Sequence, residues 1–590
     1  MKPDYEIGMT SLPGNGEIAQ ELRVLAAYLA FEGQSIYRVL AYQKAAREFG
    51  QLTDSVALAT LEGRLTELPG VGPAIEAKVR EYVETGRIAQ LEKLRSSYPE
   101  GVLEVAELDG AGPKTARRLW DELRIDSLLA VKAAAEAGRI RALKGMGAKS
   151  EAKLLSSAET ALARGPAPAP RRLLGHVEEP ARRLLQALLD HPAVAQAEIA
   201  GSFRRRRSTV RDLDLVASTD EPETVGRFFG ALPLVARVEQ SGLTKVLIHT
   251  HNDLDVDLRL VPPASFGNLL QHATGSAQHN VELRGFSQKR GLRVNEYNVE
   301  EVQTGKAHPC AEEAAVYELL GLSWIPPELR EGRGEIQAAL EGALPNLVNR
   351  EDLRGDLHVH SDWSDGRRTI EDMAIAARDR GLEYICISDH SKSIGMGIGV
   401  SDDDLRRQSE EIRLLNARLD GIELLAGSEV DILADGEIDL PDDLLASLGF
   451  VVASIHSGFQ QPVERIMARF RSALENPFVD AIGHPSGRLL GRREGYALDI
   501  EELAGTAAAT GTMLEINASY DRLDLRAAHA RRAKELGALV VISSDAHSPR
   551  GFDLLPYGVG EARRGWLEAK DVANTRPLED FRGLLRRSQR

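Results

Sequence analysis

Short apolar segments recur between residues 355 and 543 of this 590-residue chain, and a helical pattern separates each segment from the next. Such an alternation favours a parallel sheet, because parallel strands need a crossover helix between them. In barrels of this type the functional side chains lie at the carboxyl ends of the strands. The sequence therefore predicts a distorted (β/α) barrel with strands at 355–357, 384–388, 423–426, 451–454, 481–483, 513–517 and 539–543.

Histidines and carboxylates follow these predicted strands. His358 and His360 alternate on one strand face and form a chelating pair. Further histidines or carboxylates stand at 362–365, 389–390, 428–429, 455–456, 483–484 and 545–547. A single histidine is more often structural, as we interpret His529 within a helix, and a purely structural metal cluster is a second alternative. The recurrence at strand ends, without thiolates, favours a hydrolytic site for two or three Zn²⁺ or Mn²⁺ ions.

A Pro/Ala segment at 165–170 marks the clearest domain boundary. Before it, short amphipathic helices are separated by three similar glycine turns, at 68–72, 108–112 and 143–147. Glycine lets the backbone N–H groups of a helix N-terminus approach a phosphate, although one such turn alone could be an ordinary connection between helices. The candidate DNA-binding residues are Gly70, Gly72, Gly110, Gly112, Gly145 and Gly147.

After the linker the sequence predicts strands at 198–201, 212–217, 245–250 and 255–261, and two of them carry paired aspartates. Asp212 and Asp214 share one face of a strand, and Asp255 or Asp257 can add a third carboxylate. Clustered carboxylates suit Mg²⁺ or Mn²⁺ and leave room for substrate phosphates. Solvated strand faces also carry such pairs, but the upstream Gly201-Ser202 turn with its four arginines, 204–207, favours a triphosphate site.

Residues 16–300 resemble the family X DNA polymerases, of which DNA polymerase beta is a member. The resemblance lies in the Gly201-Ser202-Phe203-Arg204-Arg205 run, the aspartates, Thr274-Gly275-Ser276 and Asn295-Glu296-Tyr297. It implies dNTPs and gapped or nicked DNA as partners, and it selects Asp257 over Asp255. The implied catalytic and metal-binding residues are Asp212, Asp214 and Asp257. The implied nucleotide-binding residues are Gly201, Ser202, Arg205, Thr274, Gly275, Asn280 and Arg284.

Three positions depart from the family's pattern. Arg211 stands where glycine is common, and His272-Ala273 replace an aromatic pair. These positions bear on nucleotide placement and sugar discrimination, so the resemblance does not extend to fidelity or to ribonucleotide rejection. Lys78 falls on the position of the family's Schiff-base lysine, which implies a deoxyribose-phosphate lyase nucleophile. The alternative is a helix-surface lysine that contacts phosphate.

Residues 350–575 resemble the PHP (polymerase and histidinol phosphatase) domain. The resemblance matches each of its nine metal ligands: His358, His360, Asp365, His390, Glu429, His456, His484, Asp545 and His547. Fused to a family X polymerase, such a domain is similar to that of the bacterial PolX enzymes, and it implies 3′→5′ exonuclease or abasic-site endonuclease activity. The alternative is a PHP nuclease as the main activity, with the N-terminal half as a DNA-targeting module.

The two resemblances together divide the chain into six parts. They are a small helical DNA-binding domain with a helix-hairpin-helix (1–95), a fingers- or thumb-like helix-hairpin-helix domain (96–164), a nucleotidyltransferase palm with a mixed or antiparallel sheet (172–262), a nucleotide- and template-contacting subdomain (263–325), a linker (326–349) and the PHP barrel (350–575).

Composition bears on the partner and on the cellular compartment of the protein. The net charge of −16 does not exclude DNA, because residues 101–250 carry 23 Lys and Arg against 19 Asp and Glu. The two cysteines cannot form a disulfide framework, which suits a reducing cytoplasm. The sequence shows neither a leader nor a long apolar run, so we expect a cytoplasmic protein without membrane contact, and a monomer.

Overall fold

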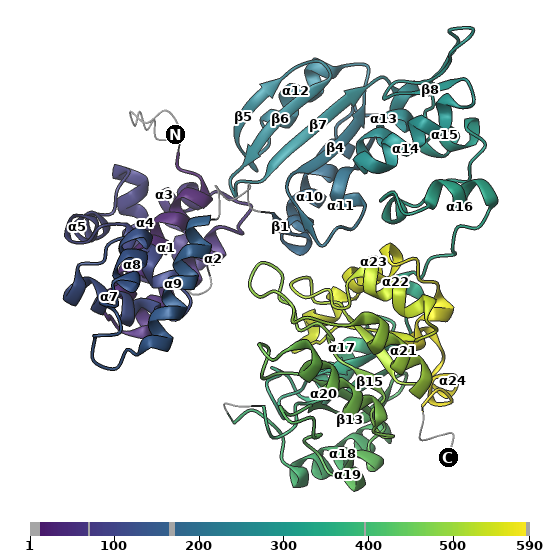
Figure 1. The fold of residues 1–590 in the computed structure, drawn as a ribbon. Helices are drawn as coiled ribbons and strands as arrows, with labels where there is room; N and C mark the ends of the chain where they lie inside the picture. Colours follow the sequence, from purple (N-terminus) through teal and green to yellow (C-terminus); the bar gives the residue numbers. More distant parts are fainter. Residues whose placement is uncertain (1–11, 69–70, 164–170, 395–396, 586–590) are drawn as a thin grey trace. The chain divides into compact units, whose positions relative to one another are not determined.

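The computed structural model describes residues 12–68, 71–163, 171–394 and 397–585, and its contacts divide the chain into two compact units (Figure 1). The first unit comprises Met1–Arg171, Arg182–Ala195 and Arg211–Leu260. The second comprises Arg172–Ala181, Gln196–Val210 and Val261–Arg590. The division runs through the predicted palm, whose residues therefore belong to both units. No helix of the described ranges is long and apolar enough to cross a membrane.

The N-terminal helices share one apolar core. Ile18 of the first helix and Leu154 of the last are buried in the same cluster of side chains. Helices from both sides of the predicted boundary at residue 95 pack together, since α1 contacts α5, α6 and α7. The helices are α1 (Asn15–Phe31), α2 (Ile36–Phe49), α3 (Val56–Leu61), α4 (Pro73–Thr85), α5 (Ala89–Ser97), α6 (Gly101–Glu107), α7 (Gly112–Leu123), α8 (Leu128–Glu136) and α9 (Ala148–Ala163).

A helix begins at or directly after each of the glycine turns. Gly110 and Gly112 have φ angles of 95° and 68°, in the left-handed region that a side chain would strain, and α7 begins at Gly112. Gly145 has φ of 81°, and α9 begins directly after Gly147. Gly72 is the N-cap of α4, whereas Gly70 lies outside the described residues. Each described turn thus directs backbone N–H groups outward from a helix N-terminus, where an anion can bind.

The sheet of the first unit carries the paired aspartates. Its strands follow the order β4-β7-β6-β5, and both β6 pairs are antiparallel. Two strands have their predicted bounds and β4 is displaced by one residue. The edge strand β5 has no predicted counterpart because its side chains are mostly exposed and lack apolar alternation. The elements are β4 (Leu213–Ser218), α12 (Pro222–Gly230), β5 (Val235–Ser241), β6 (Lys245–Thr250) and β7 (Asp255–Val261).

The second unit begins with short elements around the arginine run. The predicted strand at 198–201 ends earlier, because Gly201, with φ of 59°, starts a helix. The elements before the barrel are β1 (Arg172–Leu173), α10 (Leu174–Leu189, which continues into the first unit), β2 (Gln196–Ile199), α11 (Gly201–Arg204), β3 (Thr209–Val210), α13 (Phe266–Thr274), α14 (Ala277–Gln288), β8 (Leu292–Val294), β9 (Val299–Glu301), β10 (Ala307–His308) and α15 (Glu313–Leu319).

Residues 326–349, predicted as a linker, are folded. They contain α16 (Glu335–Glu341), whose Ile336 and Ala339 are buried in one cluster with Leu283 and Tyr317. The polar and proline-rich composition of the segment belongs to the flanks of this helix, while its inner face is apolar. This segment therefore packs with the residues predicted as the nucleotide- and template-contacting subdomain.

The barrel domain (residues 350–585) contains a seven-stranded parallel sheet in sequential order from β11 to β17. The first and last strands approach each other, since Val359 and Ala546 form a parallel bridge. The predicted strands are all present, with small shifts at their ends except for β13, which continues five residues beyond its predicted end and contains Glu429. They are β11 (Gly355–Val359), β12 (Tyr384–Ile387), β13 (Glu423–Asp431), β14 (Phe450–Ser454), β15 (Ala481–Ile482), β16 (Met513–Asn517) and β17 (Val540–Ser543).

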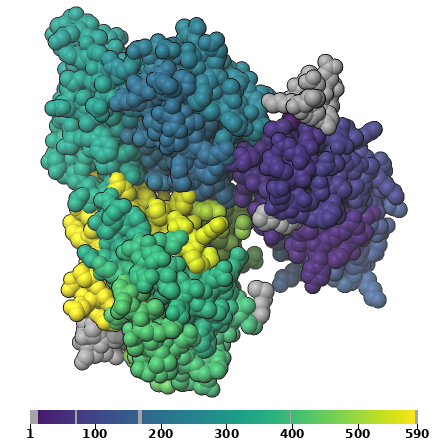
Figure 2. Space-filling view, turned by 180° about the vertical axis from the view of Figure 1, so that it is seen from behind, coloured from purple at the N-terminus to yellow at the C-terminus, as the bar shows by residue number. Residues whose placement is uncertain are grey.

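The barrel strands are buried on both faces, as expected for parallel strands covered by helices. One face packs in a large cluster with the surrounding helices, and the other forms a smaller cluster that includes Leu357, Phe450 and Phe581. Figure 2 shows residues near the C-terminus, in yellow, on the surface of the second unit. The helices are α17 (Ile370–Arg378), α18 (Asp402–Asn416), α19 (Asp442–Ser447), α20 (Val463–Glu475), α21 (Ile500–Thr510), α22 (Ala527–Glu535), α23 (Leu555–Arg564) and α24 (Leu578–Arg582).

Candidate metal centres

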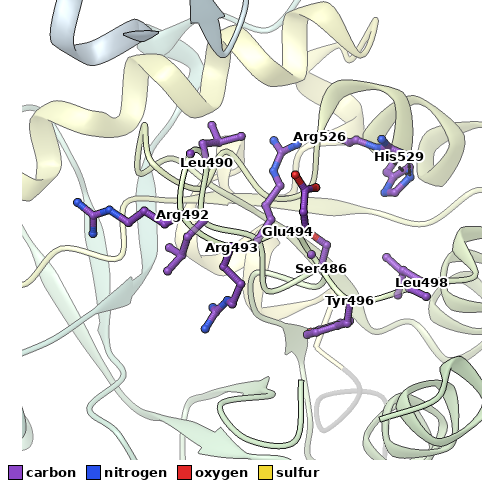
Figure 3. A pocket seen from close by; sticks show the side chains of 14 residues that line it. Ser486, Leu490, Arg492, Arg493, Glu494, Tyr496, Leu498, Arg526 and His529 are labelled. Atoms are coloured by element: carbon purple, nitrogen blue, oxygen red, sulfur yellow. Dashed lines mark hydrogen bonds between the residues drawn. The ribbon is translucent and has the colours of Figure 1, made fainter. Parts of the chain in front are cut away.

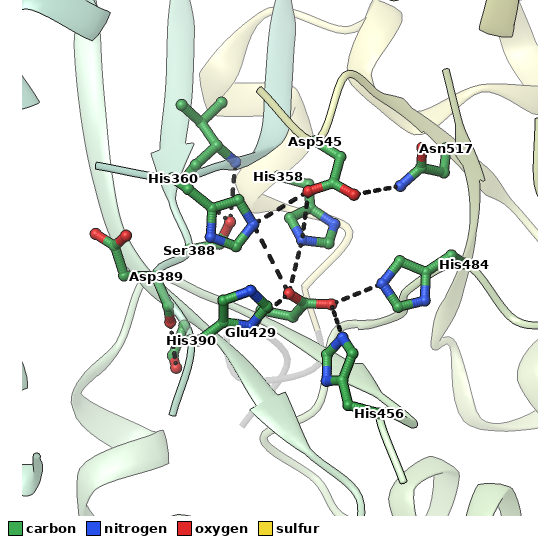
Figure 4. Close-up of polar contacts among 12 residues, drawn as sticks. His358, His360, Ser388, Asp389, His390, Glu429, His456, His484, Asn517 and Asp545 are labelled. Carbon is green, nitrogen blue, oxygen red and sulfur yellow. Dashed lines mark hydrogen bonds and ion pairs between the residues drawn. The ribbon is translucent and has the colours of Figure 1, made fainter. Parts of the chain in front are cut away.

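One buried carboxylate lies at the middle of the histidine cluster of the barrel domain (Figure 4). Glu429, on β13, is 1 % exposed. Its Oε2 lies 2.9 Å from His390 Nδ1 and 3.2 Å from His358 Nε2. Its Oε1 lies 2.9 Å from His484 Nε2 and 3.2 Å from His456 Nε2. The two oxygens thus face different histidines, an arrangement suited to a carboxylate that bridges two cations.

The other predicted ligands complete three groups of side chains. The atoms of each group that could act as ligands all lie within 4.8 Å of one another. His358 is on β11, and His360, which directly follows that strand, is shared by two groups. The groups are His360, Asp365, His390 and His547; His358, His360 and Asp545; and His390, Glu429 and His456. These groups contain eight of the nine predicted residues, and the ninth, His484, lies 2.9 Å from Glu429, so all nine are brought together at one end of the barrel.

Several ring nitrogen atoms of this cluster are buried without a hydrogen-bond partner. His358 Nε2, both ring nitrogens of His360, and His390 Nδ1 are buried without one. Burial lowers the pKa of His360 to about 3, so its imidazole is neutral and offers a lone pair. Buried polar atoms are otherwise almost always paired, and cations are the partners that neutral imidazoles and carboxylates would take here. The residues therefore fit a multi-ion centre.

Two carboxylates outside the predicted set support the cluster. Glu515, on β16, accepts a hydrogen bond from His358 Nδ1 at 2.7 Å and another from the backbone N–H of His484 at 2.5 Å. Asp431 lies 2.7 Å from His456 Nδ1. Such carboxylates fix the tautomer and orientation of metal-binding histidines. The signal of Glu515 in the sequence is a lone acidic residue inside a mostly apolar strand, whereas Asp431 ends a strand that also contains Glu423 and Glu429.

Two of the candidate ligands have strained backbones. His484 and Asp545 have φ angles of 25° and 56°, a region that side chains rarely adopt. Each stands directly after a β-strand region, at the point where the chain leaves the sheet. Asn517 Nδ2 donates to Asp545 Oδ2 at 3.0 Å and holds that carboxylate. Strain of this kind persists where the surrounding structure fixes it, as it does at functional sites.

The aspartates of the first unit lie on two strands that are neighbours in its sheet. Asp214 is on β4, Asp212 directly precedes that strand, and Asp257 is on β7. Asp257 Oδ1 is buried without a hydrogen-bond partner and lies 3.7 Å from Arg259 Nε, and its Oδ2 lies 3.1 Å from Lys245 Nζ. A buried carboxylate oxygen without a hydrogen bond fits a hard cation.

Two pairings distinguish the aspartates further. Arg211 Nη2 lies 2.8 Å from Asp212 Oδ2, so the residue that replaces the family's glycine contacts the first aspartate. Asp255 is exposed, and His249 Nδ1 lies 2.6 Å from its Oδ1. Asp255, which the resemblance did not select, therefore has a partner outside the three predicted catalytic aspartates.

The predicted nucleotide-binding residues belong to the second unit. Gly201 and Ser202 form the first turn of α11. Arg205 donates to the backbone oxygen of Thr274, and its Nε lies 3.2 Å from Glu331 Oε1. Glu331, which was outside the predicted set, thus holds the arginine predicted to contact phosphate.

The remaining nucleotide-binding candidates follow on α13 and α14. A side chain at Gly275, with φ of 66°, would lie 3.1 Å from Arg205 Nη1. Asn280 donates to the backbone oxygen of His272 at 2.8 Å, and Arg284 is exposed and donates to the backbone oxygen of Asn280. The structure thus brings Arg205, Thr274 and Gly275 together, and Asn280 lies beside the substituted position His272.

A buried ion-pair network anchors this region. Glu313 accepts hydrogen bonds from Arg204 at 2.8 Å and from Arg330 at 2.6 Å. Arg330 is fully buried. Burial opposes the charge on Glu313, yet the two guanidinium groups hold its pKa at about 2. The arginine run therefore contains a structural member, Arg204, beside the predicted phosphate-binding one.

Lys78 lies on α4 and is half-buried. Its Nζ is 3.1 Å from Glu81 Oε2. The lyase assignment stays a prediction.

Models of four known domains match the chain. A helix-hairpin-helix domain matches residues 13–88, and a SAM-like helix-hairpin-helix tandem matches residues 102–160. The DNA polymerase beta thumb matches residues 269–331, and the PHP domain matches residues 356–519. The helical region, the subdomain around α13–α15 and the barrel each have a counterpart among known families.

Two relatives give the extent of the similarity. The chain is 38 % identical over 574 residues to the DNA polymerase/3′-5′ exonuclease PolX of Bacillus subtilis, which covers 97 % of this chain and 99 % of the relative. It is 33 % identical over 203 residues to a probable phosphatase of Caldanaerobacter subterraneus subsp. tengcongensis, which covers 32 % of this chain and 75 % of that protein. The first similarity spans all of the domains described above. The chain belongs to the PolX family, the bacterial family X DNA polymerases with a C-terminal PHP domain.

Proposed function

We propose that the protein is a DNA polymerase that fills short gaps with dNTPs, and that its PHP domain trims 3′ ends as a 3′→5′ exonuclease. The observation that carries the proposal is the presence of two sets of candidate cation ligands in one chain, with a full-length relative named for both activities. The substrates would be gapped or nicked DNA, as in base excision repair. The helix-hairpin-helix turns would hold the DNA backbone through their N–H groups.

For synthesis, Asp212, Asp214 and Asp257 would hold Mg²⁺ or Mn²⁺. Bound divalent cations supply charge that activates an attacking oxygen and stabilises a leaving one. Asp257 would in addition draw the proton from the primer 3′-hydroxyl. Arg205 would leave Glu331 to hold the triphosphate, and Ser202 would donate to it.

For hydrolysis, the nine PHP residues would hold two or three Zn²⁺ or Mn²⁺ ions at Glu429. The unpartnered imidazole nitrogens support this assignment. Glu515 and Asp431 would keep His358 and His456 in the orientation that presents Nε2 to the centre. The same centre would serve an abasic-site endonuclease, since both reactions cleave a phosphodiester.

The proposal extends to the setting of the enzyme. We propose that it acts in the cytoplasm as a monomer. In the alternative function, the PHP nuclease is the main activity and the N-terminal half only targets DNA. Asp257 Oδ1, which is buried without a hydrogen bond, favours a working polymerase site over a targeting module.

Gap filling tests the polymerase assignment. We expect Asp212→Ala and Asp257→Asn to abolish dNTP incorporation on a one-nucleotide gap, because each removes a cation ligand. Asp255→Asn is the matched control, since Asp255 lies on the same strand but pairs with His249. Equal incorporation by wild type and Asp257→Asn, or none by wild type, would refute the assignment.

Trimming of a labelled 3′ end tests the hydrolase assignment in the same preparation. We expect His358→Ala to abolish Mn²⁺-dependent trimming and to leave gap filling intact. His308→Ala serves as a control, because His308 pairs with Glu301 on a surface hairpin. Loss of both activities in His358→Ala would mean that the two sites do not act independently. For Lys78, borohydride trapping of an abasic-site adduct in wild type but not in Lys78→Ala would support the lyase.

A further inference from the structure

A cavity of about 640 Å³ opens in the barrel domain at the loop that follows the candidate ligand His484 (Figure 3). This volume falls in the range of about 300–1,000 Å³ that is typical of sites for small molecules. Its polar lining comes mainly from the segment 486–498 and from the start of α22. The residues on which the inference depends are Arg488, Arg492, Arg493, Tyr496, Arg526 and His529.

Two loops that start at candidate metal ligands meet at Tyr496, a residue of the cavity wall. Phe459 stands three residues after His456, and Tyr496 lies in the loop that follows His484. Their rings are stacked, with centroids 6.1 Å apart and an interplanar angle of 15°. The guanidinium of Arg493 lies 4.0 Å from the centroid of the Phe459 ring. The cavity is therefore tied by short connections to the strand ends that carry the metal centre.

The charge of the cavity is opposite to that of the chain. Four arginines and one glutamate line it, in a protein with a net charge of −16. Arg488 and Arg493 build the wall, because their Nε atoms donate to the backbone oxygens of Arg522 and Gly487, at 2.8 and 3.0 Å. Arg492 and Arg526 are exposed. An anion that enters thus meets two guanidinium groups that solvent already reaches.

His529 adds a polar atom without a partner. Burial, together with Arg526, lowers the pKa of His529 to about 4, so the imidazole is neutral at pH 7. Its Nε2 accepts a hydrogen bond from Arg526 Nε at 2.9 Å, which leaves the ring hydrogen on Nδ1. His529 Nδ1 and the Tyr496 hydroxyl are both buried without a hydrogen-bond partner among the described residues. Such atoms call for an explanation, and a polar ligand supplies one.

We propose that this cavity holds a nucleotide of the DNA strand that is being trimmed, next to the phosphodiester at the metal centre. The inference rests on the proposed exonuclease function. Arg492 and Arg526 would bind the phosphate, and Tyr496 and His529 would face the polar atoms of the sugar or base. A single strand suits this site, because its backbone carries a negative charge at every nucleotide and its bases are free to enter a pocket.

Kinetics of trimming on a labelled single strand test the role of the arginines. We expect Arg492→Gln and Arg526→Gln each to raise KM about tenfold, the effect of losing one charged hydrogen bond, with kcat within about twofold of wild type. Each should also reduce the salt slope of log(kcat/KM) by about 0.7, the contribution of one phosphate contact on a single strand. Tyr496→Phe should raise KM and keep the ring stack. Arg465→Gln, an exposed arginine on α20, is the matched control, and gap filling by each variant reports intact folding.

Crosslinking tests the location independently of catalysis. A single strand with a photoreactive thiothymidine at its 3′ end, bound to the full chain without divalent cations, should crosslink to the peptide 486–498. Crosslinking without any trimming by wild type would contradict the proposed function and keep the cavity assignment. Trimming with unchanged KM and salt slope in both arginine variants would overturn the cavity assignment. Competition by free dAMP that depends on Arg526, with unchanged KM for the strand, would also overturn it, since the site would then hold only the product.

Discussion

Replacement of Glu515 by glutamine should lower the affinity of the PHP centre for metal ions, although no candidate ligand is replaced. Glu515 is 1 % exposed and accepts two hydrogen bonds, from His358 Nδ1 and from the backbone of His484. Glutamine has one acceptor oxygen, so one of these donors would face an amide N–H instead. A buried hydrogen bond to a charged group contributes about 1.5–3 kcal/mol, which corresponds to roughly a 10- to 100-fold change in binding. The loss of a carboxylate that orients a metal-bound histidine typically has this size.

The assay is a titration of trimming activity with Mn²⁺. We expect the half-saturating Mn²⁺ concentration of Glu515→Gln to rise about 10- to 100-fold, while gap filling stays at the level of wild type. Glu502→Gln, a half-buried residue of α21 that pairs with Arg471, controls for loss of a carboxylate in the same domain. A thermal melt of the apo protein checks the fold. Identical Mn²⁺ dependence of Glu515→Gln and wild type would refute the orienting role of this carboxylate.

Three further predictions concern charge. Glu313→Gln should lower the unfolding free energy by about 3–5 kcal/mol in denaturant titrations, because it leaves Arg330 buried without a counter-charge. The folded-state pKa of Glu313 is about 2, below its ordinary value of 4.5, so the ionised residue stabilises the wild type by about 3 kcal/mol above pH 4.5. This stabilisation is lost as the pH falls towards 2. The unfolding free energies of wild type and Glu313→Gln should therefore converge in acid. Glu429 and Asp431 raise the pKa of His456 to about 10 despite burial, Asp365 raises that of His547 to about 9, and Glu429 and Glu515 raise the pKa of His358 as well. Cations must therefore displace at least two protons at pH 7. Calorimetry in buffers of different ionisation enthalpy should record the release of these protons, and Mn²⁺ affinity that is independent of pH between 6 and 8 would contradict it. Arg211→Gly should lower the Mg²⁺ needed for gap filling by at most about fivefold, because its pair with Asp212 is mostly exposed, and a higher requirement would show that Arg211 assists the site instead.

The barrel could be predicted from the sequence because its strands are short apolar runs, and residues 384–387 or 513–517 differ from their surroundings in composition alone. The sequence also indicated Glu429 as a ligand, but it placed this residue after a strand at 423–426, whereas the structure places it within β13. The central role of this residue did not follow, because it depends on which histidines the closed barrel places around each oxygen. The role of Glu515 could not be predicted for the same reason, because its hydrogen-bond partners lie 157 and 31 residues away in the sequence.

Elsewhere the sequence pattern was weaker than the tertiary contacts. The edge strand β5 carries exposed side chains, so no apolar alternation marks it. The segment 326–349 reads as polar, yet α16 buries Ile336 against residues that lie before it in the chain. For the predicted nucleotide site, the pattern indicated Arg205 but not Glu331. A glutamate is ordinarily exposed, and only the tertiary structure brings Glu331 to the guanidinium groups of Arg205 and Arg207.

The two oxygens of Glu429 have a consequence for how the PHP centre fills. Because one side chain faces histidines of more than one group, the first cation to arrive would fix the carboxylate and displace protons from the histidines beside it, so that the next cation would meet fewer protonated ligands. Occupancy would then rise cooperatively, with a Hill coefficient above one, whereas the aspartates of the first unit share no such central residue. Trimming would therefore switch on over a narrow range of metal concentration, while synthesis would respond gradually across the same range.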